Sequence, residues 1–235
     1  MKKPKKITIK FFLNKYLRPI PVSGELCYPL YAQITYNRKN TQIKSCYGEY
    51  YASYEKMKTE NSELLAFEDK IIRNAVTYEI NKNSEDFNLL GLGDKYEIFA
   101  TGIHQILNIY LKMKLKEHLQ RDSEPKEFLA VLNFDKQYVD FELLYEAGKR
   151  LFNVFESTIE EGFLKEIEVY RAYCKLYQKI LKNKELNFPV VIEWLDGTHL
   201  HEITQKFINL YQNDTQKVEF AMQLIDRVVN TKLIF

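Results

Sequence analysis

The spacing of apolar residues changes near residue 60, and this change limits the folds open to the chain. In residues 7–14 and 30–36 apolar and polar side chains alternate, which is typical of half-buried strands. From residue 61 onwards apolar residues recur every three or four positions, which indicates amphipathic helices. The sequence therefore predicts an α+β protein, with a small three-stranded antiparallel sheet in a domain of residues 1–58 and an all-α domain of about six helices in residues 59–235.

A polar tetrapeptide, residues 37–40, separates the second and third predicted strands and indicates a hairpin. A turn centred there places Ile34 opposite Ile43 and Gln33 opposite Lys44. The apolar face of this sheet must be shielded from water by another element, and the amphipathic segment from Asn61 is the nearest candidate. The other face carries side chains that can form hydrogen bonds: Lys10, Gln33, Thr35, Gln42 and Lys44.

Positive charge is concentrated in the same segment. Residues 1–46 contain ten Lys or Arg and one acid, Glu25, so their net charge is +9, whereas the whole chain carries +2. Such asymmetry favours binding to a polyanion, although a basic tail kept for solubility has the same composition. A polar sheet face favours double-stranded DNA, because strands in the major groove present side chains to base edges. The five residues of that face would contact bases, and phosphates would be held by Lys3, Lys5, Lys6, Arg38 and Lys39.

Three stretches, ITIKFFLNK, GELCYPLYAQITYNRKNTQIKS and SELLAFEDKIIRNAVTYEI, together resemble the arm-type DNA-binding domain of tyrosine recombinases (phage-type integrases) of Bacteroidetes mobile elements. The resemblance spans about residues 5–80, and Tyr54-Glu55 stands where that family has Trp-Asp. It implies a double-stranded DNA-binding protein of a bacterial mobile element or prophage, located in the cytoplasm at the nucleoid. The family's strand motif is matched, in order, by Gly24, Glu25, Pro29, Leu30, Tyr31, Ile34 and Thr35.

The catalytic residues of the recombinase family have no counterpart. His118-Leu-Gln-Arg121 keeps only the His-to-Arg spacing of the catalytic helix, and no tyrosine follows in a suitable context. His199 and Glu202 would share one helix face, but a zinc site needs three or four converging ligands. Phosphate-binding glycine loops and nucleophile pairs are also missing. We therefore expect no catalysis, no cofactor and no metal, and an enzyme with an unrecognised site near His199 remains an alternative.

The helical body is acidic, and it would provide dimerisation or bind another protein. An alternative function is accordingly a protein-interaction or regulatory module whose body binds a partner, with no DNA binding. Helices are predicted over residues 62–83 and 94–121, and the capping-box pattern Thr158-Ile-Glu-Glu161 predicts a further helix that ends near Asn183. The segment 188–195 fits either a helix or a strand. Aromatic residues at helical spacing are expected in the core.

Cysteine usage and hydropathy bear on the compartment. Cys27, Cys46 and Cys174 are an odd number without C-x-x-C spacing, which suits reduced thiols in a cytoplasm. The start of the chain lacks the apolar core of a signal peptide, and no apolar run reaches 18 residues. A cytoplasmic protein without a membrane span is expected.

Overall fold

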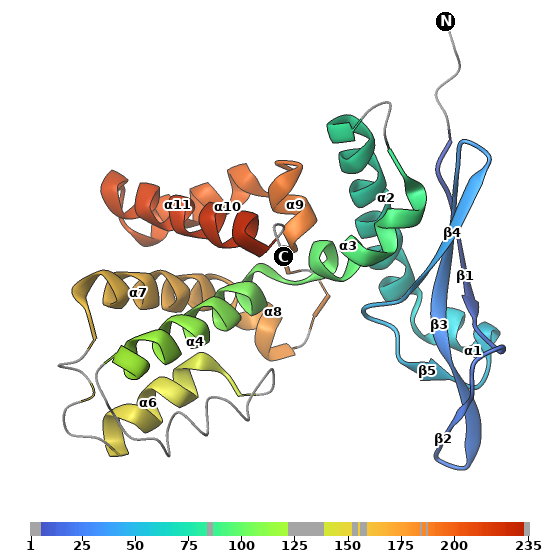
Figure 1. The fold of residues 1–235 in the computed structure, drawn as a ribbon, viewed down its shortest axis with the longest axis horizontal. Helices are drawn as coiled ribbons and strands as arrows, with labels where there is room; N and C mark the ends of the chain where they lie inside the picture. Colours follow the sequence, from blue (N-terminus) through green and yellow to red (C-terminus); the bar gives the residue numbers. More distant parts are fainter. Residues whose placement is uncertain are drawn as a thin grey trace, which may run out of the picture. The chain divides into compact units, whose positions relative to one another are not determined.

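The structure is a computed structural model that describes residues 6–83, 87–121, 139–151, 155, 159–183, 185–186 and 188–232. The chain forms two compact units, the first from residues 1–101 and 185–200 and the second from residues 102–184 and 201–235. The first unit contains a five-stranded antiparallel sheet with helices, and the described part of the second unit is helical (Figure 1). The predicted α+β class is confirmed, whereas the sheet has five strands instead of three and the described residues form about ten helices, more than the six that were expected.

One long strand, β3 (Glu25–Tyr36), holds the sheet together because every other strand pairs with it. Strands β1 (Thr8–Leu13) and β4 (Lys39–Lys44) flank its second half. Strands β2 (Ile20–Val22) and β5 (Tyr50–Tyr51) pair with its first half. The three predicted strands correspond to β1, β3 and β4, and the two short strands were not predicted.

The register of the β3–β4 hairpin differs by two residues from the prediction. Gln33 lies opposite Gln42 rather than Lys44, and Ile34 lies opposite Thr41 rather than Ile43. The reason is the turn: Asn37 and Arg38 both have positive φ, 50° and 64°, so two residues close the hairpin instead of four. A shift of two residues keeps every side chain on its predicted face, because the period of a strand is two.

The apolar face of the sheet is covered by helices, as predicted. Leu30, Ala32 and Ile34 of β3 have no exposed surface. Leu64 and Leu65 of α2 (Ser62–Asn83) pack on a core cluster of Leu13, Leu30 and Met57, the last from α1 (Tyr54–Glu60). Arg73 of α2 also donates a hydrogen bond to the carbonyl of Ile7, at 3.0 Å, and so ties the helix to the start of β1.

The first unit extends well beyond residue 58, where the sequence placed a domain boundary. The short helix η1 (Leu89–Gly91) and α3 (Leu92–Ala100) lie against β4. The segment 188–195, which the sequence fitted to either a helix or a strand, contains the helix α9 (Val191–Leu195). This helix packs on α2 and α3. A sheet this small needs these helices to bury its apolar face, which is why they belong to the same unit.

Two of the predicted helices are divided. The helix expected over residues 94–121 consists of α3 followed by α4 (Ile103–Arg121). The division occurs at Thr101, because its backbone is extended, with ψ 135°. The Thr101 carbonyl accepts a hydrogen bond from the Val191 N–H at 3.0 Å. The helix expected after the capping box and up to about Asn183 is α7 (Glu161–Leu176) and α8 (Gln178–Asn183), separated at Tyr177. The Thr158 part of the predicted capping box lies outside the described residues.

The second unit is built around α4, which contacts α7, α11 (Thr215–Lys232) and α6 (Phe141–Leu151). Helix α10 (Leu200–Leu210) lies between α8 and α11 in sequence. Many aromatic residues on these helices are core residues, as predicted: the ring of Phe141 meets those of Phe163 and Tyr170 edge to face. Phe220 of α11 is an exception, with 36% of its surface exposed. Among the residues that the structure describes, no helix combines the length and the apolar character needed to cross a bilayer.

Candidate nucleic-acid interface

The candidate interface is the outer face of β1, β3 and β4, which points away from the buried side chains of β3. Pairing across the three strands arranges its residues in three rows. The central row is Lys10–Gln33–Gln42, and the rows on either side are Thr8–Thr35–Asn40 and Phe12–Tyr31–Lys44. We define these nine residues as the outer face. The middle row contains one amine and two amides, a combination that can donate to and accept from base edges.

All five residues predicted to face bases lie on this outer face. Lys10, Gln42 and Lys44 are exposed, whereas Gln33 and Thr35 are half-buried in the central strand. The lower exposure of the central pair follows from their place between two neighbouring strands. None of the five is enclosed by the helices that cover the opposite face.

The three described residues among those predicted to bind phosphates lie at one end of the sheet. Arg38 and Lys39 are exposed at the β3–β4 turn. Lys6 is exposed and precedes Thr8, which pairs with Thr35 close to the same turn, so the N-terminal segment and the turn meet at that end (Figure 1). The other two predicted phosphate contacts, Lys3 and Lys5, lie outside the described residues.

The cations of the sheet have no acidic partners among the residues that the structure describes. Among the described residues of the first strands and turns, seven cations form no ion pair with a carboxylate: Lys6, Lys10, Lys15, Arg18, Arg38, Lys39 and Lys44. Two lysines on the helices of the first unit do have acidic partners: Lys70 lies 2.6 Å from Glu193, and Lys95 lies 2.7 Å from Glu79. The outer face and its ends therefore keep a positive potential that an external anion can neutralise.

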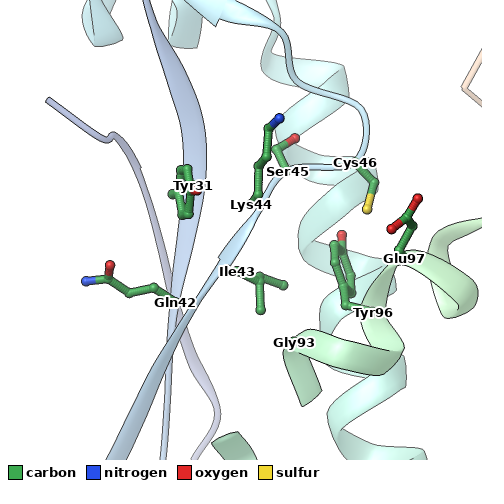
Figure 2. A pocket seen from close by; sticks show the side chains of 9 residues that line it. All are labelled: Tyr31, Gln42, Ile43, Lys44, Ser45, Cys46, Gly93, Tyr96 and Glu97. Atoms are coloured by element: carbon green, nitrogen blue, oxygen red, sulfur yellow. The ribbon is translucent and has the colours of Figure 1, made fainter. Parts of the chain in front are cut away.

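A groove of about 550 Å³ runs beside the outer face (Figure 2). One wall is formed by β4 and the residues after it, and the other is formed by α3. Lys44 and Gln42 therefore border both the outer face and the groove, and Glu97 stands on the opposite wall. The full lining is Tyr31, Gln42, Ile43, Lys44, Ser45, Cys46, Gly93, Tyr96 and Glu97.

A buried carboxylate holds three of the residues that line this groove. Glu68 of α2 has no exposed surface, and it accepts hydrogen bonds from Ser45 Oγ at 2.6 Å, from the Cys46 N–H at 2.9 Å and from Tyr96 Oη at 2.9 Å. Loss of solvent raises the pKa of Glu68, and the three hydrogen bonds oppose that rise. Glu68 thereby joins the end of β4 to α2 and α3.

Glu68 was not singled out in the sequence, although a signal for it exists. It stands within the apolar stripe of α2, four residues after Leu64 and three before Ile71. An acid at a core-facing position needs hydrogen-bond donors, because burial of an unpaired charge is costly. The donors come from the segment that follows β4 and from another helix, and only the tertiary structure identifies them.

Cys46 points its thiol towards Tyr96 and Glu97 in the groove (Figure 2). Its pKa is raised to about 12, first by loss of solvent and then by the charges of Glu68 and Glu97. The group is therefore a neutral thiol at neutral pH, and it is not an activated nucleophile. None of the three cysteines forms a disulfide, in agreement with the expectation of reduced thiols.

The histidine positions do not form a site with the residues that the structure describes. His199 Nε2 lies 3.4 Å from the buried carboxylate of Glu193, and Glu202 pairs with Lys206 at 2.6 Å. His118 is buried and stacks on Phe163, with ring centroids 4.9 Å apart, so it belongs to the core. Across the described residues no group of three potential metal ligands converges.

Comparison of the chain with protein-family models, with curated proteins and with solved structures yields no match.

Proposed function

We propose that the chain is a non-catalytic protein that binds double-stranded DNA through the outer face of its sheet. The observation that carries the proposal is a polar strand face whose cations have no acidic partners among the described residues. Polyanions bind such surfaces because each neutralised phosphate releases a counterion. The resemblance to arm-type domains supports a role in a bacterial mobile element or prophage.

The dimensions of the face suit the major groove. Three strands about 4.8 Å apart are about 10 Å wide from β1 to β4, and the groove is about 12 Å wide. Successive rows on one face are about 6.6 Å apart, close to the rise of two base pairs. The three rows would therefore contact about four or five base pairs.

The side chains have distinct roles in this arrangement. Lys10 and Lys44 would donate to guanine, and Gln33 and Gln42 would pair with adenine. Thr35 would contact either base. The backbone would be held by Lys3, Lys5, Lys6, Arg38 and Lys39, which carry charge but no sequence information.

The proposal is tested by fluorescence anisotropy with a mixed-sequence 20-bp duplex and the full chain. If the five phosphate-binding cations all contribute, the slope of log affinity against log salt is about −4.5, which is about a 500-fold loss between 50 and 200 mM salt. Charge reversal at Arg38 and Lys39 is expected to remove about 1.8 from that slope for every sequence. Substitution of Gln33 or Gln42 by Ala changes the preferred sequence instead.

A matched control is offered by two exposed lysines of the second unit that already have partners. Lys165 pairs with Glu161 at 2.9 Å, and Lys217 lies 3.7 Å from Asp214. Charge reversal at both lysines is expected to leave the salt slope unchanged. Absence of duplex binding at 50 mM salt refutes the proposed function.

A further inference from the structure

Strand β2 and the start of β3 form a second hairpin, which extends away from the helices of the first unit (Figure 1). Its turn is Ser23-Gly24, with φ of 49° and 86°, and the paired residues are Ile20 with Cys27 and Val22 with Glu25. Every residue of β2 is exposed. We call residues 20–26 the β2 hairpin.

The β2 hairpin exposes apolar side chains on both of its sides. Ile20 and Val22 lie on one side and are 40% and 43% exposed. Pro21 and Leu26 lie on the other side, and Leu26 is 59% exposed. A partner with a flat surface could cover only one side of the β2 hairpin. The hairpin therefore suits a partner into which it can be inserted.

The hairpin is continuous with the proposed DNA interface, because β3 belongs to both. Gln33 and Gly24 are nine positions apart, a length of about 30 Å along an extended strand that lies lengthwise in the major groove. The groove winds around the duplex once in about 34–36 Å, so a straight strand of this length leaves it and brings the hairpin to the neighbouring part of the duplex. The base of the hairpin carries Lys15 and Arg18, which are exposed and form no ion pair with the described residues.

We propose that the β2 hairpin is a wedge that enters the minor groove beside the major-groove site, partly unstacks one base step and bends the duplex. The inference rests on the proposed function. Ile, Leu and Pro are among the residue types that proteins insert between base steps, and Ile20, Pro21 and Leu26 supply them along the two sides of the hairpin, behind the Val22–Glu25 pair that adjoins the turn. Arg18 suits a narrow minor groove, where the negative potential is enhanced.

The experiment uses the full chain and a 20-bp duplex with donor and acceptor dyes at its ends. Its central steps are TA, the most easily kinked, and 2-aminopurine replaces one adenine there. The duplex is about 68 Å long, and a 60° bend at its centre shortens the end-to-end distance to about 59 Å. Binding of the natural sequence is expected to raise energy transfer and to brighten 2-aminopurine as its base unstacks.

The test variant is Ile20→Ser/Val22→Ser/Leu26→Ser, which changes exposed side chains only. It is expected to bind the duplex within about threefold of the natural affinity but to leave energy transfer and 2-aminopurine at their free-duplex values. The control variant replaces three exposed apolar residues of the second unit by Ser: Met113, Leu143 and Leu164, which are 54%, 66% and 36% exposed. This control variant is expected to bend the duplex as much as the natural sequence does.

The outcomes separate the wedge from the proposed function. Binding by the natural sequence without bending, or equal bending by the hairpin variant, overturns the wedge and leaves DNA binding intact. Failure of every variant to bind at low salt overturns the proposed function as well. Co-sedimentation with phosphatidylserine vesicles distinguishes a lipid partner. If the natural sequence does not bend the duplex, and the hairpin variant differs from it only by losing co-sedimentation, the hairpin binds a bilayer and the wedge is refuted.

Discussion

Removal of the Glu68 carboxylate tests the packing that supports the outer face. In Glu68→Ala the Ser45 hydroxyl, the Cys46 N–H and the Tyr96 hydroxyl all lose their acceptor in a buried region. Each buried donor left without a partner costs about 1–3 kcal/mol, and partial relaxation brings the expected total to about 3–5 kcal/mol. The isosteric Glu68→Gln keeps an acceptor oxygen, so its cost should be clearly smaller.

The chain contains a reporter for this measurement. Trp194 is the single tryptophan, it is buried, and it belongs to the same unit as Glu68. Urea unfolding followed by tryptophan fluorescence therefore reports the stability of that unit. A loss of less than about 1 kcal/mol in Glu68→Ala would show that the three donors find other partners, and the account of this buried network would then be wrong.

The pH dependence gives a second readout of the same residue. Burial raises the pKa of Glu68 in the folded state above its ordinary value of 4.5. Between pH 4.5 and the higher pKa of the folded state, the folded protein binds more protons than the unfolded chain. The free energy of unfolding therefore falls as pH rises through that window. Glu68→Gln is expected to remove this fall and to leave the contributions of other groups unchanged.

Three further changes have expected outcomes. Gly48→Ala places a Cβ 2.5 Å from Leu30 Cδ2, and it should cost about 1–3 kcal/mol in urea unfolding followed by fluorescence; an unchanged midpoint would contradict the close contact. Arg38→Gly relieves the strain of a non-glycine residue in the left-handed region, so it should raise the free energy of unfolding by up to about 1 kcal/mol. The same substitution should weaken duplex binding measured by anisotropy. A loss of stability would contradict the turn geometry. Arg227→Ala removes a half-exposed ion pair with Glu166, and circular dichroism should show a loss of only about 0.2–1 kcal/mol; a larger loss would mean that the pair is more buried than described.

The candidate interface was predictable in its composition and only partly in its geometry. Alternation in the strands assigned Gln33 and Lys10 to the same face without any knowledge of the register, because a strand has period two. The register itself depended on φ at Asn37 and Arg38, and most sequences with a polar tetrapeptide allow more than one turn there. The groove and the hydrogen-bond partners of Glu68 could not be predicted, because they come from segments more than twenty residues apart.

The sequence by itself determined the class of the protein, the positions of three strands and the concentration of positive charge in the first fifth of the chain. These properties are local, since they depend on periodicity and composition within short segments. Only the tertiary structure decided which helices complete the sheet unit, where the helix predicted over residues 94–121 divides, and that the β2 hairpin stays exposed on both sides. Those outcomes depend on contacts between distant segments, such as Val191 with Thr101, whose free energy no local pattern contains.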